Sequence, residues 1–187
     1  MHRRTLFLAV FGLSILLTGC KKELKPDQLA PGVQTGQVYY TQFSLFQEKN
    51  NFRTTNYRKG ILIPINTPVT LQAINSGQAD LRLVESGQPL SIENVSKHTQ
   101  EDMQTAFKKI AAPAKVDLSQ FSAAEQEAIL AGQVKKGMSR KAVLAAIGYP
   151  PLTETPTLNS NDWVYWKHRF DRFVVHFKND KVDNIVD

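Results

Sequence analysis

The sequence predicts an α+β fold in which a β-rich unit comes first and a helical segment followed by a β-hairpin comes second. Three observations support this expectation. Short β-rich runs separated by turn residues fill residues 36–98. Helix-capping patterns then recur between residues 99 and 148. Three further strand-like runs follow over residues 162–186.

The chain begins with a segment typical of a secretory signal peptide. Arg3 and Arg4 precede an uncharged apolar run from Leu6 to Thr18. This run is too short to remain as a spanning helix, which needs about 20 apolar residues. A charged start, a short apolar middle and small residues at the end favour export followed by removal of residues 1–19.

The end of this segment indicates a lipid anchor. Leu17-Thr18-Gly19-Cys20 resembles the lipobox of bacterial lipoproteins, in which the cysteine receives a diacylglycerol and acyl chains such as palmitate. The alternative is an ordinary secretory signal with Cys20 near the cleavage site. Cys20 is the only cysteine, so no disulfide is expected. Two or three acyl chains would attach the protein to a membrane lastingly.

The residues after Cys20 favour the outer membrane, with the folded part expected in the periplasm. Loss of residues 1–19 lowers the formal charge from +6 to +4, and no long basic run with interleaved aromatics suggests nucleic-acid binding. Lys21 and Lys22 would each contribute about 1 kcal/mol of attraction to anionic headgroups. Gram-negative lipoproteins with Asp after the cysteine tend to stay at the inner membrane, and resemblance to them makes Lys21 an outer-membrane signal.

Residues 20–35 are polar and contain three Pro or Gly residues, so we expect the lipidated cysteine to be followed by a tether. The β-rich module occupies residues 36–98. Its expected strands are Val38–Phe46, Phe52–Tyr57, Ile61–Ile65, Val69–Ile74, Ala79–Glu85 and Leu90–Val95. The run from Ile61 to Leu71 loosely resembles an SH3-like barrel that would bind a peptide or glycan. The alternative is a structural β unit that packs on the next domain.

Three helices are expected from their caps. The expected N-caps are Thr99, Ser122 and Ser139. The first helix and a linker would fill residues 99–121. Ser122 and Glu125 form a capping box for the second helix, and the third would end at Gly148.

The strands expected after the last helix are Asp162–His168, Arg172–Lys178 and Val182–Val186. A tip at Phe170-Asp171 would place Val164, Trp166 and His168 on an apolar face with Phe173, Val175 and Phe177. That face would cover the helices. The parity of Val182 and Ile185 requires either a bulge in the last strand or an outward Ile185.

The C-terminal third resembles the SmpA/OmlA family, which includes the BamE-like lipoproteins of the outer-membrane β-barrel assembly machine. The residues that carry the resemblance are Ile129-x-x-Gly132, Gly137-Met138-Ser139-x-x-x-Val143, Gly148-Tyr149-Pro150, Trp163-Val164-Tyr165 and Val175-x-Phe177-x-Asn179-Asp180-Lys181-Val182. The resemblance implies a helix–helix–three-strand domain over residues 122–187 and a scaffold role without catalysis. It also implies an outer-membrane assembly partner and binding of acidic phospholipid. Residues 36–95 and the loop Pro150–Asn161 depart from the family's pattern.

The candidate binding residues lie on the hairpin. Trp163, Tyr165 and Lys167 would share its outward face, with large aromatics beside a charge as is favoured at interfaces. Arg169 and Arg172 would flank the tip and could bind a phosphate headgroup or an acidic partner. The alternative is that this face packs on the β-rich module.

Catalytic chemistry has little support in the sequence. The mature chain has three histidines, His98, His168 and His176, without the local spacing of a zinc site. We therefore expect no catalytic residue, no metal and no cofactor. The expected function is that of a scaffold or accessory binding factor in outer-membrane assembly or envelope integrity. The alternative is a peptidoglycan- or peptide-binding lipoprotein that acts through the β-rich module.

The anchor gives the first testable prediction. Cys20→Ala removes the thiol that would receive the lipid, so metabolic labelling with an acyl probe should be abolished and maturation blocked. Labelling that persists in this variant would contradict the lipobox assignment.

Overall fold

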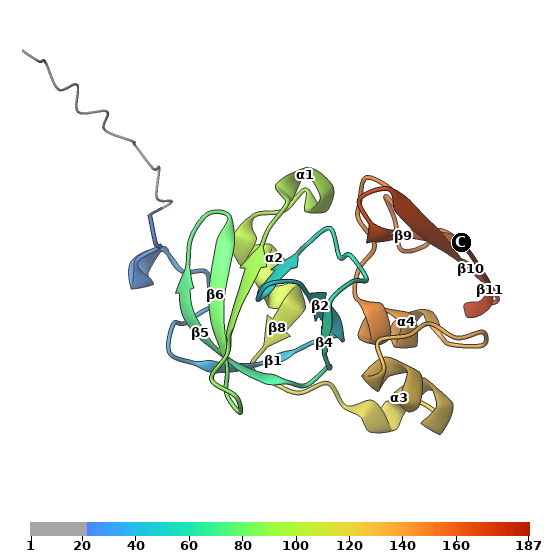
Figure 1. The fold of residues 1–187 in the computed structure, drawn as a ribbon, viewed down its shortest axis with the longest axis horizontal. Coiled ribbons are helices and arrows are strands. Elements are labelled where there is room, and N and C mark those ends of the chain that lie inside the picture. The colour runs from blue at the N-terminus through green and yellow to red at the C-terminus, as the bar shows by residue number, and fades with distance from the viewer. Residues whose placement is uncertain (1–21) are drawn as a thin grey trace, which may run out of the picture.

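The computed structural model describes residues 22–187, so the expected signal peptide, Cys20 and Lys21 lie outside the described residues. It shows an α+β protein with two hydrophobic cores. Residues 22–112 form a first unit around a curled mixed sheet, and residues 116–187 form a second unit around a three-stranded antiparallel sheet. The two units follow one another along the long axis of the molecule (Figure 1).

The first unit is dominated by short strands. Its elements are η1 (Pro26–Gln28), β1 (Val38–Thr41), β2 (Leu45–Gln47), β3 (Asn51–Arg53), β4 (Ile61–Ile63), β5 (Pro68–Ile74), β6 (Gln78–Leu83), β7 (Pro89–Glu93), α1 (Ser96–Thr99), α2 (Met103–Ile110) and β8 (Ala111–Ala112). Six strands form one sheet in the order β3-β7-β6-β5-β1-β8, and only the β3–β7 pair is parallel. β2 and β4 form a separate antiparallel pair. The expected strand Val38–Phe46 is therefore two strands that belong to different sheets.

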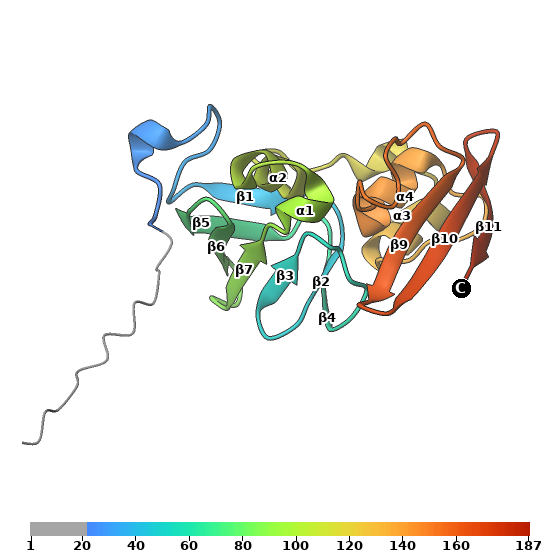
Figure 2. The ribbon, with the colours of Figure 1, turned by 90° about the horizontal axis from the view of Figure 1, so that it is seen from above.

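The expectation of a free tether over residues 20–35 is wrong for most of that segment. The backbone N–H of Leu24 donates to Ile74 O at 2.8 Å, and the N–H of Ala30 donates to the side chain of Gln104 at 2.6 Å. Val33 is buried in the first core. The sequence suggested a tether because the segment is polar, but Leu24, Leu29 and Ala30 pack against the first core. Figure 2 shows η1 at the same end of the molecule as β5 and β6.

The helix expected at Thr99 begins later and has a different role. Asp102 is the N-cap of α2, and its carboxylate accepts the N–H of Thr105 at 2.8 Å. Thr99 instead ends the single turn α1. α2 buries its apolar side in the first core, and β8 directly after it pairs with β1. The segment is therefore part of the first unit and does not act as a connector.

The caps of the next two helices are confirmed. The second unit contains η2 (Leu118–Gln120), α3 (Ala123–Leu130), α4 (Arg140–Ile147), β9 (Asp162–His168), β10 (Asp171–Lys178) and β11 (Lys181–Val186). Ser122 and Glu125 form the expected capping box of α3, and Ser139 caps α4. Glu125 also accepts the N–H and the hydroxyl of Ser139 at 2.8 and 2.9 Å, so one carboxylate joins the starts of both helices.

The three expected C-terminal strands are present almost at the expected bounds, but the hairpin register is different. The turn is at Arg169-Phe170, and a bulge between Asp171 and Arg172 shifts the pairing. Phe173, Val175 and Phe177 face the core as expected. Tyr165 lies opposite Phe173, so the expected faces of β9 are reversed, and Trp163 and Tyr165 take the core side. The pairing of β10 with β11 shifts register between His176 and Phe177. The last strand therefore contains a bulge, which was one of the two alternatives expected from Val182 and Ile185.

Aromatic-to-backbone and polar contacts join the units. The ring of Phe43 in the first unit lies against the backbone of Gly148 in the second. The side chain of Asn56 is buried and donates to Ile147 O at 2.5 Å and to Tyr149 O at 3.2 Å. The hydroxyl of Ser44 donates to a carbonyl of α3 at 2.6 Å. These contacts hold the second unit against the β2–β4 side of the first.

Arg58 adds a charged contact to the same junction. Its guanidinium donates to Gly132 O at 2.9 Å and lies 4.5 Å from the centre of the Phe46 ring. Burial lowers the pKa of Arg58 to about 10, and the side chain remains cationic at neutral pH. The carbonyl and the aromatic face compensate part of the lost hydration.

The stability of the fold should depend on the charge of Glu125. Burial by itself raises the pKa of this carboxyl, but hydrogen bonds from Ser139 and Ser122 outweigh it and lower the pKa from 4.5 to about 2. Because the folded pKa is depressed, this stabilisation is complete above pH 4.5 and is lost as the pH falls toward 2. It amounts to about 3 kcal/mol. Urea unfolding from pH 7 to 2 should show this loss, and Glu125→Gln should remove it. The exposed Glu127, changed to Gln, is the matched control and should leave the pH dependence intact.

The junction should tolerate no side chain at residue 148. A Cβ there would lie 2.6 Å from the Phe43 ring, on a backbone with φ of 74°. We expect Gly148→Ala to lower the free energy of unfolding by about 2–4 kcal/mol. Gly87→Ala has a similar φ of 68° but no atom within 4 Å, so it should cost only about 1 kcal/mol. Equal losses in thermal or urea unfolding would contradict a steric requirement at the junction.

Candidate functional site

Trp163 and Tyr165 do not lie on an outward face, which corrects the expected binding surface. Both side chains are buried in the second core. The indole N–H of Trp163 donates to Leu158 O at 3.2 Å, and the hydroxyl of Tyr165 donates to Gly148 O at 2.9 Å. Burial raises the pKa of the Tyr165 phenol well above its ordinary value. These large side chains fill the core. The prediction of an outward face was wrong because it assumed a hairpin register without the bulge between Asp171 and Arg172.

Two of the three expected cations are bound within the protein. Lys167 lies 3.1 Å from Asp187 and 3.6 Å from Asp171, and the hydrogen bond to Asp187 raises the pKa of Lys167. Arg172 pairs with Glu154 at 3.0 Å and lies over the ring of Trp166. These carboxylates oppose the binding of an anionic group by either residue.

Arg169 differs from these two cations. Its guanidinium lies 5.3 Å from the centre of the Phe170 ring at the hairpin tip. Phe170 is 85% exposed, more than any other large apolar side chain described. The ion pairs among residues 22–187 include none that involves Arg169. The tip therefore offers an aromatic ring and a cation, and the rest of the expected surface does not.

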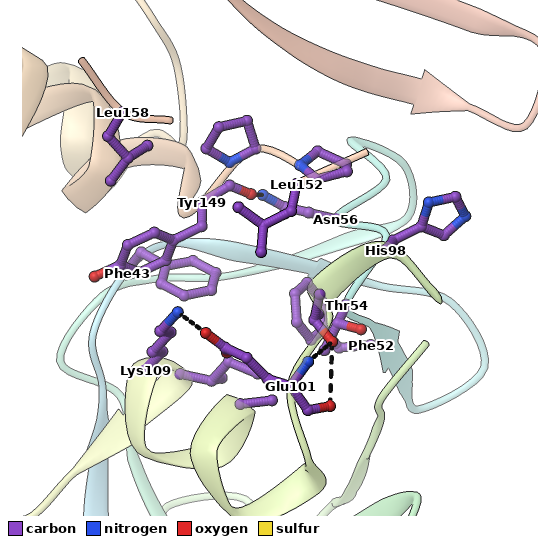
Figure 3. Close-up of a pocket in the computed structure, with 15 residues that line it drawn as sticks. Phe43, Phe52, Thr54, Asn56, His98, Glu101, Lys109, Tyr149, Leu152 and Leu158 are labelled. Carbon is purple, nitrogen blue, oxygen red and sulfur yellow. Dashed lines mark hydrogen bonds and ion pairs between the residues drawn. The ribbon is translucent and has the colours of Figure 1, made fainter. Parts of the chain in front are cut away.

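A pocket between the two units is the most developed candidate site (Figure 3). The first unit contributes the β1–β2 loop, β3 and α2, and the second contributes the segment after α4. The apolar side chains that line it are Phe43, Phe52, Ala106, Ile110, Tyr149, Pro150, Pro151, Leu152 and Leu158. The cavity has a volume of about 140 Å³. A cavity of roughly 150 Å³ accommodates one benzene molecule, so the space suits a single apolar side chain.

The polar groups around this pocket already have partners. Asn56 donates to two carbonyls of the α4 end, and the hydroxyl of Thr54 is hydrogen bonded to Asn94 at 3.1 Å. Glu101 and Lys109 form an ion pair with each other at the rim, which Figure 3 shows as a dashed line. A ligand rich in polar groups would find few free partners here, whereas an apolar group would lose nothing by entering.

Leu152 closes the pocket from the second unit. Figure 3 shows its side chain directed between Tyr149 and Phe52. The N–H of Leu152 donates to His98 O at 2.9 Å, which ties this loop to the first unit. The sequence did not identify this site, because its walls come from segments about a hundred residues apart. The only local indication of the pocket in the sequence was Pro150-Pro151. Proline has no backbone N–H, so these two residues add no hydrogen-bond donor to the apolar wall.

The three histidines of the described chain do not converge. His98 Nδ1 is hydrogen bonded to Thr153 at 2.8 Å at the pocket rim, and His176 Nδ1 to Asp162 at 2.6 Å on the hairpin. His168 lies near the hairpin tip beside Asp171. No group of three or more His, Cys, Asp or Glu side chains within residues 22–187 is placed to hold a metal ion. Across the same range, no helix has the length and apolar character needed to cross a membrane.

No family model, no curated protein and no solved structure matches this chain. Its function must therefore be inferred from its own sequence, its fold and the contacts of its side chains.

Proposed function

We propose that this chain is a non-enzymatic lipoprotein of the bacterial outer membrane that acts as a scaffold or accessory binding factor in outer-membrane assembly or envelope integrity. The lipobox at Cys20 supports the membrane attachment. The resemblance of residues 126–187 to the SmpA/OmlA family supports the envelope role, and the pair of helices against a three-stranded sheet is compatible with it.

The apolar pocket between the units is the observation that carries this proposal. Its volume of about 140 Å³ fits one leucine or phenylalanine side chain of a partner protein. A buried apolar anchor in a formed pocket is the usual centre of a protein–protein interface. The polar side chains at its wall already have partners: Asn56 binds backbone carbonyls at the end of α4, His98 binds Thr153, and Glu101 pairs with Lys109.

The junction makes the pocket rigid. Phe43 and Asn56 both line the pocket. Phe43 also packs on Gly148, and Asn56 also donates a hydrogen bond to the end of α4. A pocket whose walls are already fixed costs little ordering when a side chain enters. Binding affinity therefore does not have to compensate for assembly of the site.

The alternative, peptidoglycan binding through the β-rich unit, has one observation in its favour. A second hollow of about 120 Å³ is lined by two aromatic and four polar side chains, which are Phe46, Glu48, Asn51, Arg53, Tyr57 and Lys59. The Oδ1 atom of Asn51 is buried there without a hydrogen-bond partner. Lys59 pairs with Glu48 and Arg53 pairs with Glu93, which makes this the weaker site.

Photocrosslinking in intact cells tests the proposed function. A photoreactive amino acid at residue 152, inside the pocket, should capture an outer-membrane assembly component. The same amino acid at residue 130 is the matched control, because Leu130 is also a leucine, is 47% exposed and lies on α3 away from the pocket. Capture from 130 alone, or no envelope protein from either, would contradict the proposal.

Substitution of the pocket gives the complementary result. With the photoreactive amino acid at residue 149, Leu152→Asp should reduce capture at least tenfold, because burial of a carboxylate in an apolar pocket costs more than the about 1–3 kcal/mol of a neutral polar group. Leu130→Asp should leave capture unchanged. Recovery of glycan strands from a probe at Tyr57, with no protein recovered from 152, would favour the alternative function.

A further inference from the structure

The distance between the expected lipid anchor and the folded protein is short. The N–H of Leu24 is fixed to Ile74 O at 2.8 Å, at the end of β5. Only Lys21, Lys22 and Glu23 separate that residue from Cys20. A fully extended chain spans at most about 3.6 Å per residue, so the four steps from Cys20 to Leu24 cover about 14 Å at most.

Contacts along the whole following segment keep it in place. Gly36 N–H donates to Leu71 O at 2.7 Å, and Leu71 N–H donates to Gln37 O at 3.1 Å. Val33 is 6% exposed, and the hydroxyl of Tyr39 accepts the N–H of Gln34 at 2.8 Å. Removal of the segment from the sheet would break several hydrogen bonds and expose apolar surface at once. The chain therefore cannot lengthen its link to the membrane cheaply.

The end of the first unit next to this link has the chemistry to lie on a lipid surface. The β5–β6 turn there is Asn75-Ser76-Gly77, which is polar and uncharged, and Ser76 is exposed. The exposed Lys22 lies on the link and the exposed Lys25 directly follows its fixed end, with the exposed Glu23 between them, so residues 22–25 carry a net charge of +1. A neutral turn beside a segment of net positive charge can approach anionic headgroups, and each cation near the surface adds about 1 kcal/mol of attraction.

The second unit lies at the opposite end of the molecule. Figures 1 and 2 show the first described residues beside the β5–β6 end, and the helices and sheet of the second unit at the far end of the long axis. The junction through Phe43, Asn56 and Arg58 fixes the direction of the second unit relative to the first. A short link at one end and a rigid junction in the middle together restrict the whole molecule.

We propose that the membrane-bound protein stands on the bilayer by its β5–β6 end, with the anionic headgroups against residues 22–25 and 75–77, and that the second unit is directed away from the membrane. This inference rests on the proposed acylation of Cys20. It assigns the lipid surface as the partner of one end of the first unit and leaves the pocket and the second unit accessible to soluble or membrane-embedded partners above the surface.

Fluorescence quenching in vesicles tests the orientation. Because Cys20 is the only cysteine and is consumed by the lipid, engineered cysteines are the only free thiols. Ser76→Cys places a fluorophore on the proposed contact, and Lys136→Cys, whose side chain is 78% exposed in the α3–α4 loop, is the matched distal position. The acylated full-length protein would be reconstituted into phosphatidylethanolamine–phosphatidylglycerol vesicles with nitroxide-labelled headgroups. Quenching should be several-fold stronger at 76 than at 136.

A variant with a longer link tests whether the short link causes the orientation. Insertion of fifteen Gly/Ser residues between Lys22 and Glu23 leaves every described contact in place but releases the restraint, so the difference between the two probes should largely disappear. A difference that survives the insertion would show that the short link does not set the orientation. Equal quenching of the two probes in the unextended protein, when it floats with the vesicles, would overturn the orientation alone. Failure to float would overturn both the orientation and the proposed membrane attachment.

Discussion

The contact between the Phe43 ring and the Gly148 backbone is the constraint on which the rest of the arrangement depends. It brings the end of α4 so close to the β1–β2 loop that no Cβ fits between them. Once that approach is made, the carbonyls of Ile147 and Tyr149 come within reach of Asn56, and the hydroxyl of Ser44 reaches α3. An aromatic ring against bare backbone has little freedom to slide, because protein interiors are close-packed. The two units are consequently joined by close packing and by several hydrogen bonds at one place.

The pocket is a consequence of this junction. Phe43 and Tyr149 meet edge to face at 6.5 Å, and the chain then turns through Pro150 and Pro151 to place Leu152 over the first unit. The polar side chains nearby are used to hold the loops, which leaves an apolar hollow of the size of one side chain. The same residues thus fix the architecture and form the proposed binding site, so substitutions there will alter stability and binding together. Leu152, which is only half-buried, is the position at which the two effects separate best.

The segment that follows Cys20 is docked on the first unit. A flexible tether would allow a lipoprotein to present any face to its surroundings. Here residues 24–37 are bonded to β5 and α2, which leaves only three residues between Cys20 and the docked segment. With Cys20 acylated as we propose, orientation at the membrane would follow from covalent reach and would not require a dedicated lipid-binding surface. In that arrangement, the contacts that join the two units would also determine how far the pocket stands from the bilayer.

How much the sequence determined differs between elements. The caps at Ser122 and Ser139 and the C-terminal strand bounds could be predicted, because each depends on residues within a few positions of one another. Thr99 and Asp102 both fit the local pattern of a cap, and only packing of α2 into the first core distinguishes them. The surface residues could not be predicted in the same way. Trp163 and Tyr165 were predicted on the wrong face because one bulge near the hairpin tip shifts the pairing of every residue beyond it. Such a bulge has no clear local sequence signal.

The docked tether and the pocket depend on contacts between segments far apart in the chain. The sequence by itself therefore determined the order and type of the elements and the expected lipid site at Cys20, through short-range chemistry. Only the tertiary structure decided which side chains face solvent, where the pocket lies and how the chain leaves its anchor, because burial is a property of what packs from elsewhere.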